Sequence, residues 1–155
     1  MCELLGEDLL SVGKTQPSAR TVMVLNRDLM LGIAIGNTAR ALGFAVERVT
    51  KTSELTERLR EGRLVVSLVI IDMNMNIEWS EIAKLIQSAH DLPPMMGFGP
   101  HVDIDGRRAA KQAGLTRIVS NGEFHRDMAA LIQRYARATP DGQSATTDEQ
   151  FEELD

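Results

Sequence analysis

The stretch Val66-Ser67-Leu68-Val69-Ile70-Ile71-Asp72 decides the fold of this chain. Apart from Ser67, every residue before the aspartate is apolar, and such a continuous run is typical of a strand buried on both faces of a parallel sheet. A sheet of that kind needs helices on both sides. The run ends in a carboxylate, Asp72, which makes the carboxyl end of this strand the first place to look for a functional site.

The same kind of short apolar run recurs along the chain and alternates with helical patterns. The predicted strands are residues 21–25, 45–49, 66–71, 95–98 and 116–119. The predicted helices are residues 28–42, 53–61, 79–89, 104–113 and 124–138. Five repeats of strand and helix predict an α/β fold, a doubly wound five-stranded parallel sheet with helices on both faces.

Turn and capping residues between the segments support these boundaries. Gly43, Gly62 and Gly114 each follow a predicted helix, where a glycine readily takes the left-handed conformation that ends it. Ser53 is expected to cap the second helix. Methionines 23, 95 and 96 fall on strands, and Met23 together with Met95 or Met96 is expected to fill the core.

The 155 residues divide into a lead-in, a domain and a tail. In residues 1–20, Leu4, Leu5, Leu9 and Val12 fall near one face of a predicted short helix. Residues 21–138 form the domain. Residues 139–155 carry six acids and no Lys or Arg, and we expect a disordered acidic tail.

Composition excludes several classes of function. The chain has 22 acids and 17 bases, and without the six tail acids it is close to neutral, so a basic nucleic-acid face is not expected. A lone Cys2 allows no internal disulfide. Neither a leader nor a membrane span is expected, and the default location is the cytoplasm.

Polar residues follow the strands, where an open α/β sheet binds ligands. These candidates are Asn26, Arg27, Asp28, Asp72, Asn74, Gly99, His101, Asp103, Ser120 and Asn121. Asp72 stands out because it ends an apolar strand, although a carboxylate there can also simply accept hydrogen bonds from the loop backbone. His101 and Asp103 are more consistent with a polar loop and a helix cap than with a metal site.

Three segments resemble the CheY-like response-regulator receiver family. Residues 66–72 are similar to the family's PDLVLLD, residues 94–103 (PMMGFGPHVD) to PVIALTAHAD, and residues 112–119 (QAGLTRIV) to EAGADDYL. The resemblance covers residues 21–138 and implies a flavodoxin-like strand order of 2-1-3-4-5. It also implies that Asp72 is equivalent to the phosphoacceptor of bacterial two-component signalling.

The departures from the family pattern all fall on the phosphorylation pocket. Where the family has two Mg²⁺-binding acids after strand one, this chain has Asn26 and Arg27. The family's lysine after strand five is Ser120, its Ser/Thr after strand four is Gly99, and its aromatic switch residue is Arg117. Mg²⁺ prefers carboxylate oxygens, so this pocket is a degenerate one in which Asp28 is the other nearby acid.

These losses favour a pseudo-receiver that acts through protein–protein interaction, with neither enzyme activity nor a cofactor. Arg27 is expected to pair with Asp72 rather than to bind phosphate. The partner is expected to be a kinase or another signalling protein, or a second copy in a homodimer. The resemblance implies that it meets the family's usual contact face, here residues 107–111, Arg117 and residues 126–134. Two alternatives stay open: a response regulator modified at Asp72 by a histidine kinase with Mg²⁺, and a small-ligand or nucleotide binder at the same crevice.

Overall fold

A computed structural model describes residues 20–137 of the chain. Its five strands form one parallel sheet in the order β2-β1-β3-β4-β5, which confirms the predicted sheet and the strand order that the resemblance implied. The strands are β1 (Thr21–Leu25), β2 (Ala45–Val49), β3 (Val66–Asp72), β4 (Met95–Gly99) and β5 (Arg117–Ser120).

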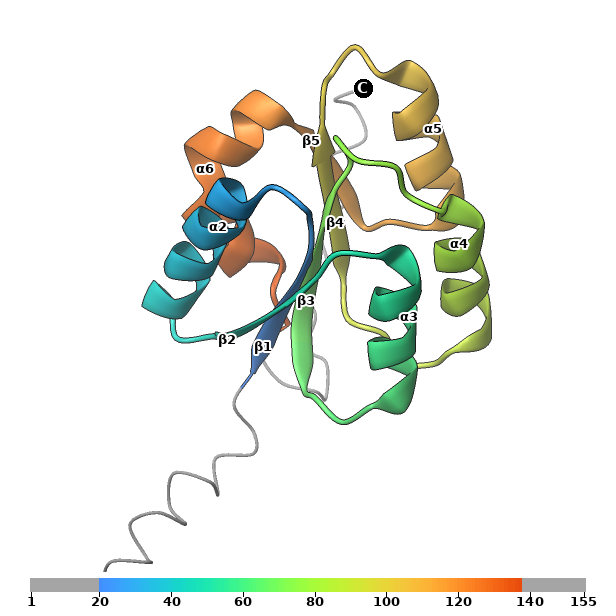
Figure 1. The fold of residues 1–155 in the computed structure, drawn as a ribbon, viewed down its shortest axis with the longest axis horizontal. Helices are drawn as coiled ribbons and strands as arrows, with labels where there is room; N and C mark the ends of the chain where they lie inside the picture. Colours follow the sequence, from blue (N-terminus) through green and yellow to red (C-terminus); the bar gives the residue numbers. More distant parts are fainter. Residues whose placement is uncertain (1–19, 138–155) are drawn as a thin grey trace, which may run out of the picture.

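Helices cover both faces of this sheet (Figure 1). The helices are α2 (Leu29–Ala41), α3 (Thr52–Glu61), α4 (Trp79–Ser88), α5 (Ile104–Ala113) and α6 (Asn121–Tyr135). α2 and α6 pack together on one face, while α3, α4 and α5 follow one another across the other. Right-handed crossovers between parallel strands produce this division, because the chain reverses its winding direction after β2.

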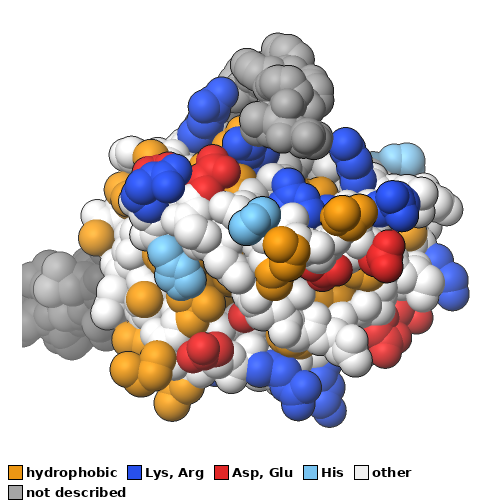
Figure 2. Space-filling view, turned by 90° about the horizontal axis from the view of Figure 1, so that it is seen from above, with side chains coloured by type: hydrophobic (Ala, Val, Ile, Leu, Met, Phe, Trp, Pro, Cys, Tyr) orange, Lys and Arg blue, Asp and Glu red, His pale blue; other side chains and the backbone are white. Residues whose placement is uncertain are grey.

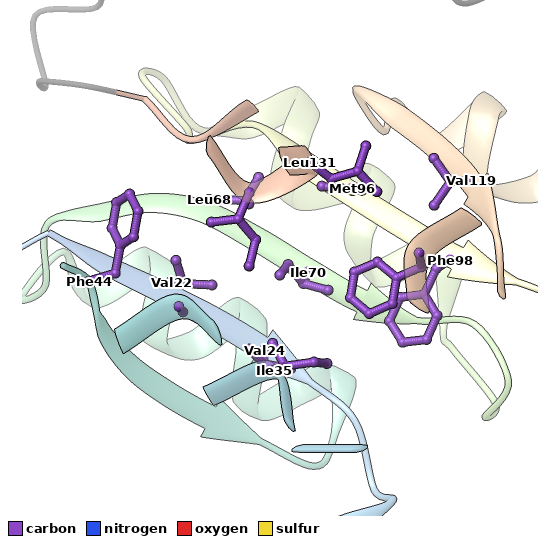
Figure 3. Close-up of a cluster of buried hydrophobic side chains, with 13 residues drawn as sticks. Val22, Val24, Ile35, Phe44, Leu68, Ile70, Met96, Phe98, Val119 and Leu131 are labelled. Carbon is purple, nitrogen blue, oxygen red and sulfur yellow. The ribbon is translucent and has the colours of Figure 1, made fainter. Parts of the chain in front are cut away.

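The core under α2 and α6 is one continuous apolar cluster (Figure 3). Phe98 of β4 stacks on Phe124 of α6 with the ring centroids 4.0 Å apart, and both side chains are fully buried. Val24 of β1 and Ile35 of α2 extend the cluster toward β1. These contacts fix α6 against the centre of the sheet.

The core under the other three helices contains much of the chain's methionine. Met23 and Met95 are buried there, and Met96 is buried on the α6 side, which confirms the prediction that these residues fill the core. Met73, directly after β3, is also buried in this second cluster, and Met75 packs against it.

The element boundaries differ from the sequence prediction in small but informative ways. β3 and β4 each run one residue further, and β5 is shifted by one residue. α6 begins at Asn121 rather than at residue 124, because Ser120 caps it. The expected cap at Ser53 is wrong: Lys51 occupies the N-cap position of α3 without a side-chain hydrogen bond, and Ser53 lies inside the helix.

The glycines after the helices adopt the backbone conformation that the sequence predicts. Gly43, Gly62 and Gly114 have φ angles of 95°, 66° and 111°. The predicted lead-in helix and acidic tail lie outside the described residues. Within residues 20–137, no helix is long and apolar enough to cross a membrane.

Candidate functional site

The carboxyl ends of the strands meet at one edge of the sheet, which Figure 2 views from above. A pocket of about 570 Å³ lies at this edge. Its walls come from four loops and helix starts and comprise Arg27, Asp28, Leu31, Asp72, Asn74, Met75, Asn121 and His125. The fold therefore brings together five of the residues that the sequence put forward: Arg27, Asp28, Asp72, Asn74 and Asn121.

Asp72 is a buried carboxylate, with 4% of its surface exposed. Its Oδ1 accepts hydrogen bonds from the backbone N–H of Asn74 at 2.9 Å and from the Asn74 side-chain amide at 2.8 Å. The β3–α4 loop thus turns back on the strand end and binds its terminal carboxylate. Acceptance from the loop backbone, one of the two interpretations of Asp72, is confirmed.

Asn74 connects this loop to the start of α6. The side-chain amides of Asn74 and Asn121 donate to each other at 3.0 and 3.1 Å. On the next turn of α6, Nδ1 of His125 lies 3.1 Å from the carbonyl oxygen of Asn121. One hydrogen-bonded chain consequently runs from Asp72 across the pocket wall to α6.

Asn26 directly follows β1, at the position that the resemblance assigns to the family's first acid, and it is completely buried. Its amide oxygen accepts a hydrogen bond from Nε of Arg48 at 2.8 Å, and its amide nitrogen donates to the carbonyl oxygen of Asp28 at 2.8 Å. Gly32 of α2 makes room for this pair, because a Cβ at that position would lie 2.7 Å from Nε of Arg48. The Asn26 oxygen is therefore bound to a cationic side chain.

The two residues after Asn26 have separate positions. Asp28 is the N-cap of α2, and its Oδ1 accepts from the backbone N–H of Leu31 at 3.1 Å. Arg27 is exposed and lines the pocket. The expected Arg27–Asp72 ion pair is wrong: among the ion pairs of the described residues none joins them, and the Asp72 carboxylate is bound by Asn74 instead. An exposed guanidinium gains little from leaving water to reach a carboxylate that already has donors.

Gly99 ends β4 beneath a methionine. A Cβ on Gly99 would lie 3.0 Å from Cβ of Met73, and a Cβ on Gly97 would lie 2.7 Å from Sδ of Met73. The Met73 side chain thus packs directly on the β4 backbone, where the family's hydroxyl-bearing residue follows strand four. Glycine at both positions is what allows this contact.

Ser120 and Arg117 both contribute to the start of α6. The Ser120 hydroxyl accepts from the backbone N–H of Glu123 at 3.1 Å. The Arg117 guanidinium pairs with the Glu123 carboxylate at 3.3 Å, and the Arg117 side chain is 11% exposed. The expectation that Arg117 forms part of an open contact surface is therefore wrong, because its side chain is mostly buried and pairs with Glu123 within the domain. In the other two predicted ranges, residues 108, 111, 126, 129, 130, 133 and 134 are exposed, whereas Arg107 is half-buried and Ala110, Leu131 and Ile132 are buried.

The donor set at this edge does not fit a hard divalent cation. Within residues 20–137, no three His, Cys, Asp or Glu side chains come together as metal ligands. Asp72 is bound by Asn74, Asp28 caps a helix, and the remaining oxygen at the β1 end faces an arginine. His101 lies in an exposed turn, and Asp103 caps α5 through Gly106, as a polar loop and helix cap predict.

Two residues of this edge were missed by reasoning from the sequence. Arg48 lies on β2 within Ala45–Val49, and nothing in that strand's pattern indicates that its side chain reaches Asn26. The other residue is His125, which the sequence does not single out. It is exposed, but it lines the pocket and contacts Asn121.

Comparison with known proteins was informative only at the level of structure. No protein-family model and no curated protein sequence matches the chain. The chemotaxis protein CheY4 of Vibrio cholerae superposes with a TM-score of 0.59 at 17% identity, covering 76% of this chain and 98% of CheY4.

Two further receiver structures agree. The phosphorylated cyanobacterial phytochrome response regulator RcpA gives a TM-score of 0.63 at 12% identity, covering 74% of this chain and 92% of RcpA. The beryllofluoride-activated NtrC4 receiver domain dimer gives 0.57 at 13% identity, covering 75% and 98%. The strand order β2-β1-β3-β4-β5 of this chain is that of the CheY-like fold. The chain has the fold of a CheY-like response-regulator receiver domain, with a different set of side chains at the carboxyl edge of its sheet.

Proposed function

We propose that this chain is a receiver-like signalling module that works by protein–protein contact without Mg²⁺-dependent phosphorylation. It binds a kinase, another signalling protein or a second copy of itself, and it catalyses no reaction. The observation that carries the proposal is the hydrogen bond from Nε of Arg48 to the buried amide oxygen of Asn26, at 2.8 Å.

A metal ion at this edge would have to compete with that arginine. Arg48 places a guanidinium at the oxygen that would be the first ligand from β1, and guanidinium is a permanent cation. Two cations do not share one neutral amide oxygen in a buried site, because their mutual repulsion is poorly screened there. The second position, Arg27, adds another positive charge and no ligand.

Transfer of a phosphoryl group to Asp72 would also lack its usual supports. Phosphoryl transfer relies on cations and donors held in position around the phosphoryl oxygens. Removing one such group from a preorganised site costs about 2.7–4 kcal/mol of barrier. Here Ser120 caps α6 and Gly99 lies under Met73, so neither reaches a phosphoryl group with a side-chain donor.

The test is incubation of the full chain with Mg²⁺ and either acetyl phosphate or beryllofluoride. Intact mass spectrometry is expected to show no phosphoryl adduct, and calorimetric titration with Mg²⁺ alone is expected to show no binding. A phosphoryl adduct that disappears in Asp72→Asn would overturn the proposal in favour of a phosphoacceptor modified by a histidine kinase.

A matched variant shows whether the missing acids at the end of β1 account for the expected lack of Mg²⁺ binding. Asn26→Asp combined with Arg27→Asp restores both family acids at the end of β1, and Arg48→Ala is added to remove the competing cation. This triple variant is expected to bind Mg²⁺ measurably. If the triple variant fails to bind Mg²⁺ as the natural chain does, these three residues are not the reason that the natural chain lacks a Mg²⁺ site.

The second candidate function is binding of a small ligand or nucleotide in the same pocket. The observation that favours it is the size of the pocket, about 570 Å³, which lies within the range of about 300–1,000 Å³ usual for ligand sites. A ligand that binds the native state raises the melting temperature, by an amount that grows with the logarithm of 1 + L/Kd, where L is the free ligand concentration. A thermal-shift screen with nucleotides tests this, with Asn121→Ala as the variant that should lose any shift.

A further inference from the structure

The solvent-facing side of α2 is unusually apolar at its N-terminal end. Leu29, Met30 and Ile33 are 60%, 72% and 48% exposed. We call these three residues the α2 patch. In Figure 2, hydrophobic side chains gather at the lower left, the side on which α2 lies in Figure 1.

The patch is a continuous surface and not three scattered side chains. Residues one, three and four positions apart lie within about a third of the helix circumference. The opposite side of α2 already has its place in the core, where Ile35 and Ala39 are fully buried. α2 is therefore apolar on two sides, and only one of them is covered by residues 20–137.

We propose that the α2 patch is the docking site of this chain's own residues 4–12. This segment supplies Leu4, Leu5, Leu9 and Val12, which fall on one face when the segment is helical. The proposal is independent of the proposed function, because it concerns a surface outside the Asp72 pocket.

Charge complements the apolar match. Residues 1–12 contain three acids, Glu3, Glu7 and Asp8, and no Lys or Arg. The exposed arginines Arg27 and Arg40 lie next to the two ends of α2. Asp28, which directly precedes the patch, accepts a hydrogen bond from the Leu31 backbone as the helix cap. Acids of the segment are thus attracted to Arg27 beside the patch and to Arg40 further along α2, by a modest amount for exposed charges.

The tether is long enough for this contact. β1 separates Arg20 from the start of α2 and, at five residues, spans about 17 Å. The eight peptide units between Val12 and Arg20 reach at most about 26–29 Å when extended. Residues 4–12 can therefore lie along α2 without any displacement of the domain.

The size of the patch favours a tethered segment over a second copy. A stable dimer buries about 800 Å² on each partner, much more than three partly exposed side chains provide. A tethered segment needs less area, because its effective concentration at the patch is in the millimolar range. Once docked, the segment covers the helix that carries Leu31 to the pocket, and a partner approaching over α2 has to displace it.

The single cysteine, Cys2, allows a direct test on the full chain. A nitroxide is attached to Cys2, and amide signals are compared before and after its reduction. The amides of residues 29–33 are expected to lose most of their intensity while the nitroxide is paramagnetic. The amides around Leu64, an exposed apolar residue in the α3–β3 connection, are expected to keep theirs.

Variants with matched controls identify the contact. Met30→Glu combined with Ile33→Glu should abolish the intensity loss at α2, and so should Leu5→Glu combined with Leu9→Glu. Leu64→Glu combined with Ile104→Glu, which adds the same two charges at exposed apolar positions away from α2, should leave it in place. All the domain positions changed are exposed, so the variants are expected to remain folded, which their amide spectra verify.

Two results would overturn the proposal. One is no selective intensity loss on α2 in the natural chain. The other is an equal intensity loss in a mixture of two chains, one carrying the nitroxide but no ¹⁵N and the other carrying ¹⁵N but no nitroxide. A loss in that mixture is intermolecular and assigns the patch to a second copy.

Discussion

At the scale of single residues, the contact between Arg48 and Asn26 defines the edge of this sheet. A buried amide must have its hydrogen bonds satisfied, and Asn26 satisfies both ends, with Arg48 at one and the Asp28 backbone at the other. Gly32 is the third member of the arrangement, since any side chain there would meet Nε of Arg48. A neutral residue at the end of β1 thus has a structural role of its own.

Gly32 and Gly36 lie one turn apart on α2, and comparing an alanine substitution at each of them tests this arrangement. Ala in place of Gly stabilises a helix interior by about 0.8–1.0 kcal/mol. Gly36→Ala should show this gain, because its Cβ meets only the flexible end of Arg40 at 3.2 Å. Gly32→Ala should instead lose about 1 kcal/mol net, because it displaces Arg48 and leaves the buried Asn26 oxygen unsatisfied. Urea unfolding measures both changes.

The control is the same pair of substitutions in an Arg48→Ala background. With the arginine side chain gone, most of the destabilisation by Gly32→Ala should disappear, because only Oδ1 of Asn26, 3.1 Å from the added Cβ, still lies close. If Gly32→Ala stays equally destabilising there, Arg48 is not the group that requires glycine at this position.

Arg27 provides the second prediction at this scale. Arg27 is exposed and forms no ion pair with Asp72, so Arg27→Ala should change the free energy of unfolding by no more than about 0.5 kcal/mol. Thermal and urea unfolding of the variant measure this. A loss of several kcal/mol would indicate that the guanidinium does compensate the buried Asp72 carboxylate.

At the scale of elements, the start of α6 is set by Ser120, which acts as a helix cap where the family has a lysine. Ser120-Asn121-Gly122-Glu123 has the spacing of a serine cap, and the Ser120 hydroxyl accepts from the Glu123 backbone N–H. The Glu123 carboxylate is occupied by Arg117. The helix consequently begins three residues before its apolar pattern does, and this brings Asn121 to the pocket opposite Asn74.

Replacement of Ser120 tests the cap. Ser120→Lys, the family's residue, should destabilise the domain by about 1 kcal/mol, because it removes the cap and places a cation at the positive end of the helix dipole. Ser120→Asp should keep the stability of the natural chain. Calorimetric melting of the two variants gives the comparison, and equal melting temperatures would show that the cap contributes nothing.

At the scale of the whole molecule, Arg137 closes the domain at the end of the sheet opposite the pocket. Its backbone N–H donates to the carbonyl oxygen of Ser67 at 2.8 Å. Its side chain is 12% exposed and contacts the Asp91 carboxylate at 3.4 Å. Asp91 has a φ of 59°, so the Arg137 contact lies at a backbone turn that few residues with a side chain adopt.

Truncation from the C-terminus shows which residues the folded domain needs for its stability. A chain ending at residue 139 should melt at the same temperature as the full chain, because residues 140–155 have the composition of a solvated tail. A chain ending at residue 136 should lose about 1–3 kcal/mol, because the Ser67 carbonyl loses its donor and the Arg137 contacts disappear. A lower melting temperature on removal of residues 140–155 alone would instead show that the tail packs on the domain.

The sequence by itself determined the sheet, its helices and most of their ends. The apolar run of residues 66–71 could be buried only between two helical layers, and glycines 43, 62 and 114 marked where helices must stop. It also identified Asp72, Asn26 and Ser120 as strand-end residues, because periodicity and turn chemistry are local properties that a single segment carries.

Only the tertiary structure decided what these residues contact. Arg48 and Asn26 are 22 positions apart, and Asn74 and Asn121 are 47 apart, so no local pattern records either pairing. The expected partner of Asp72 was an arginine, and the loop supplied Asn74. Side chains at strand ends are selected by which loops the fold brings beside them, and that depends on the order of strands in the sheet rather than on their order in the chain.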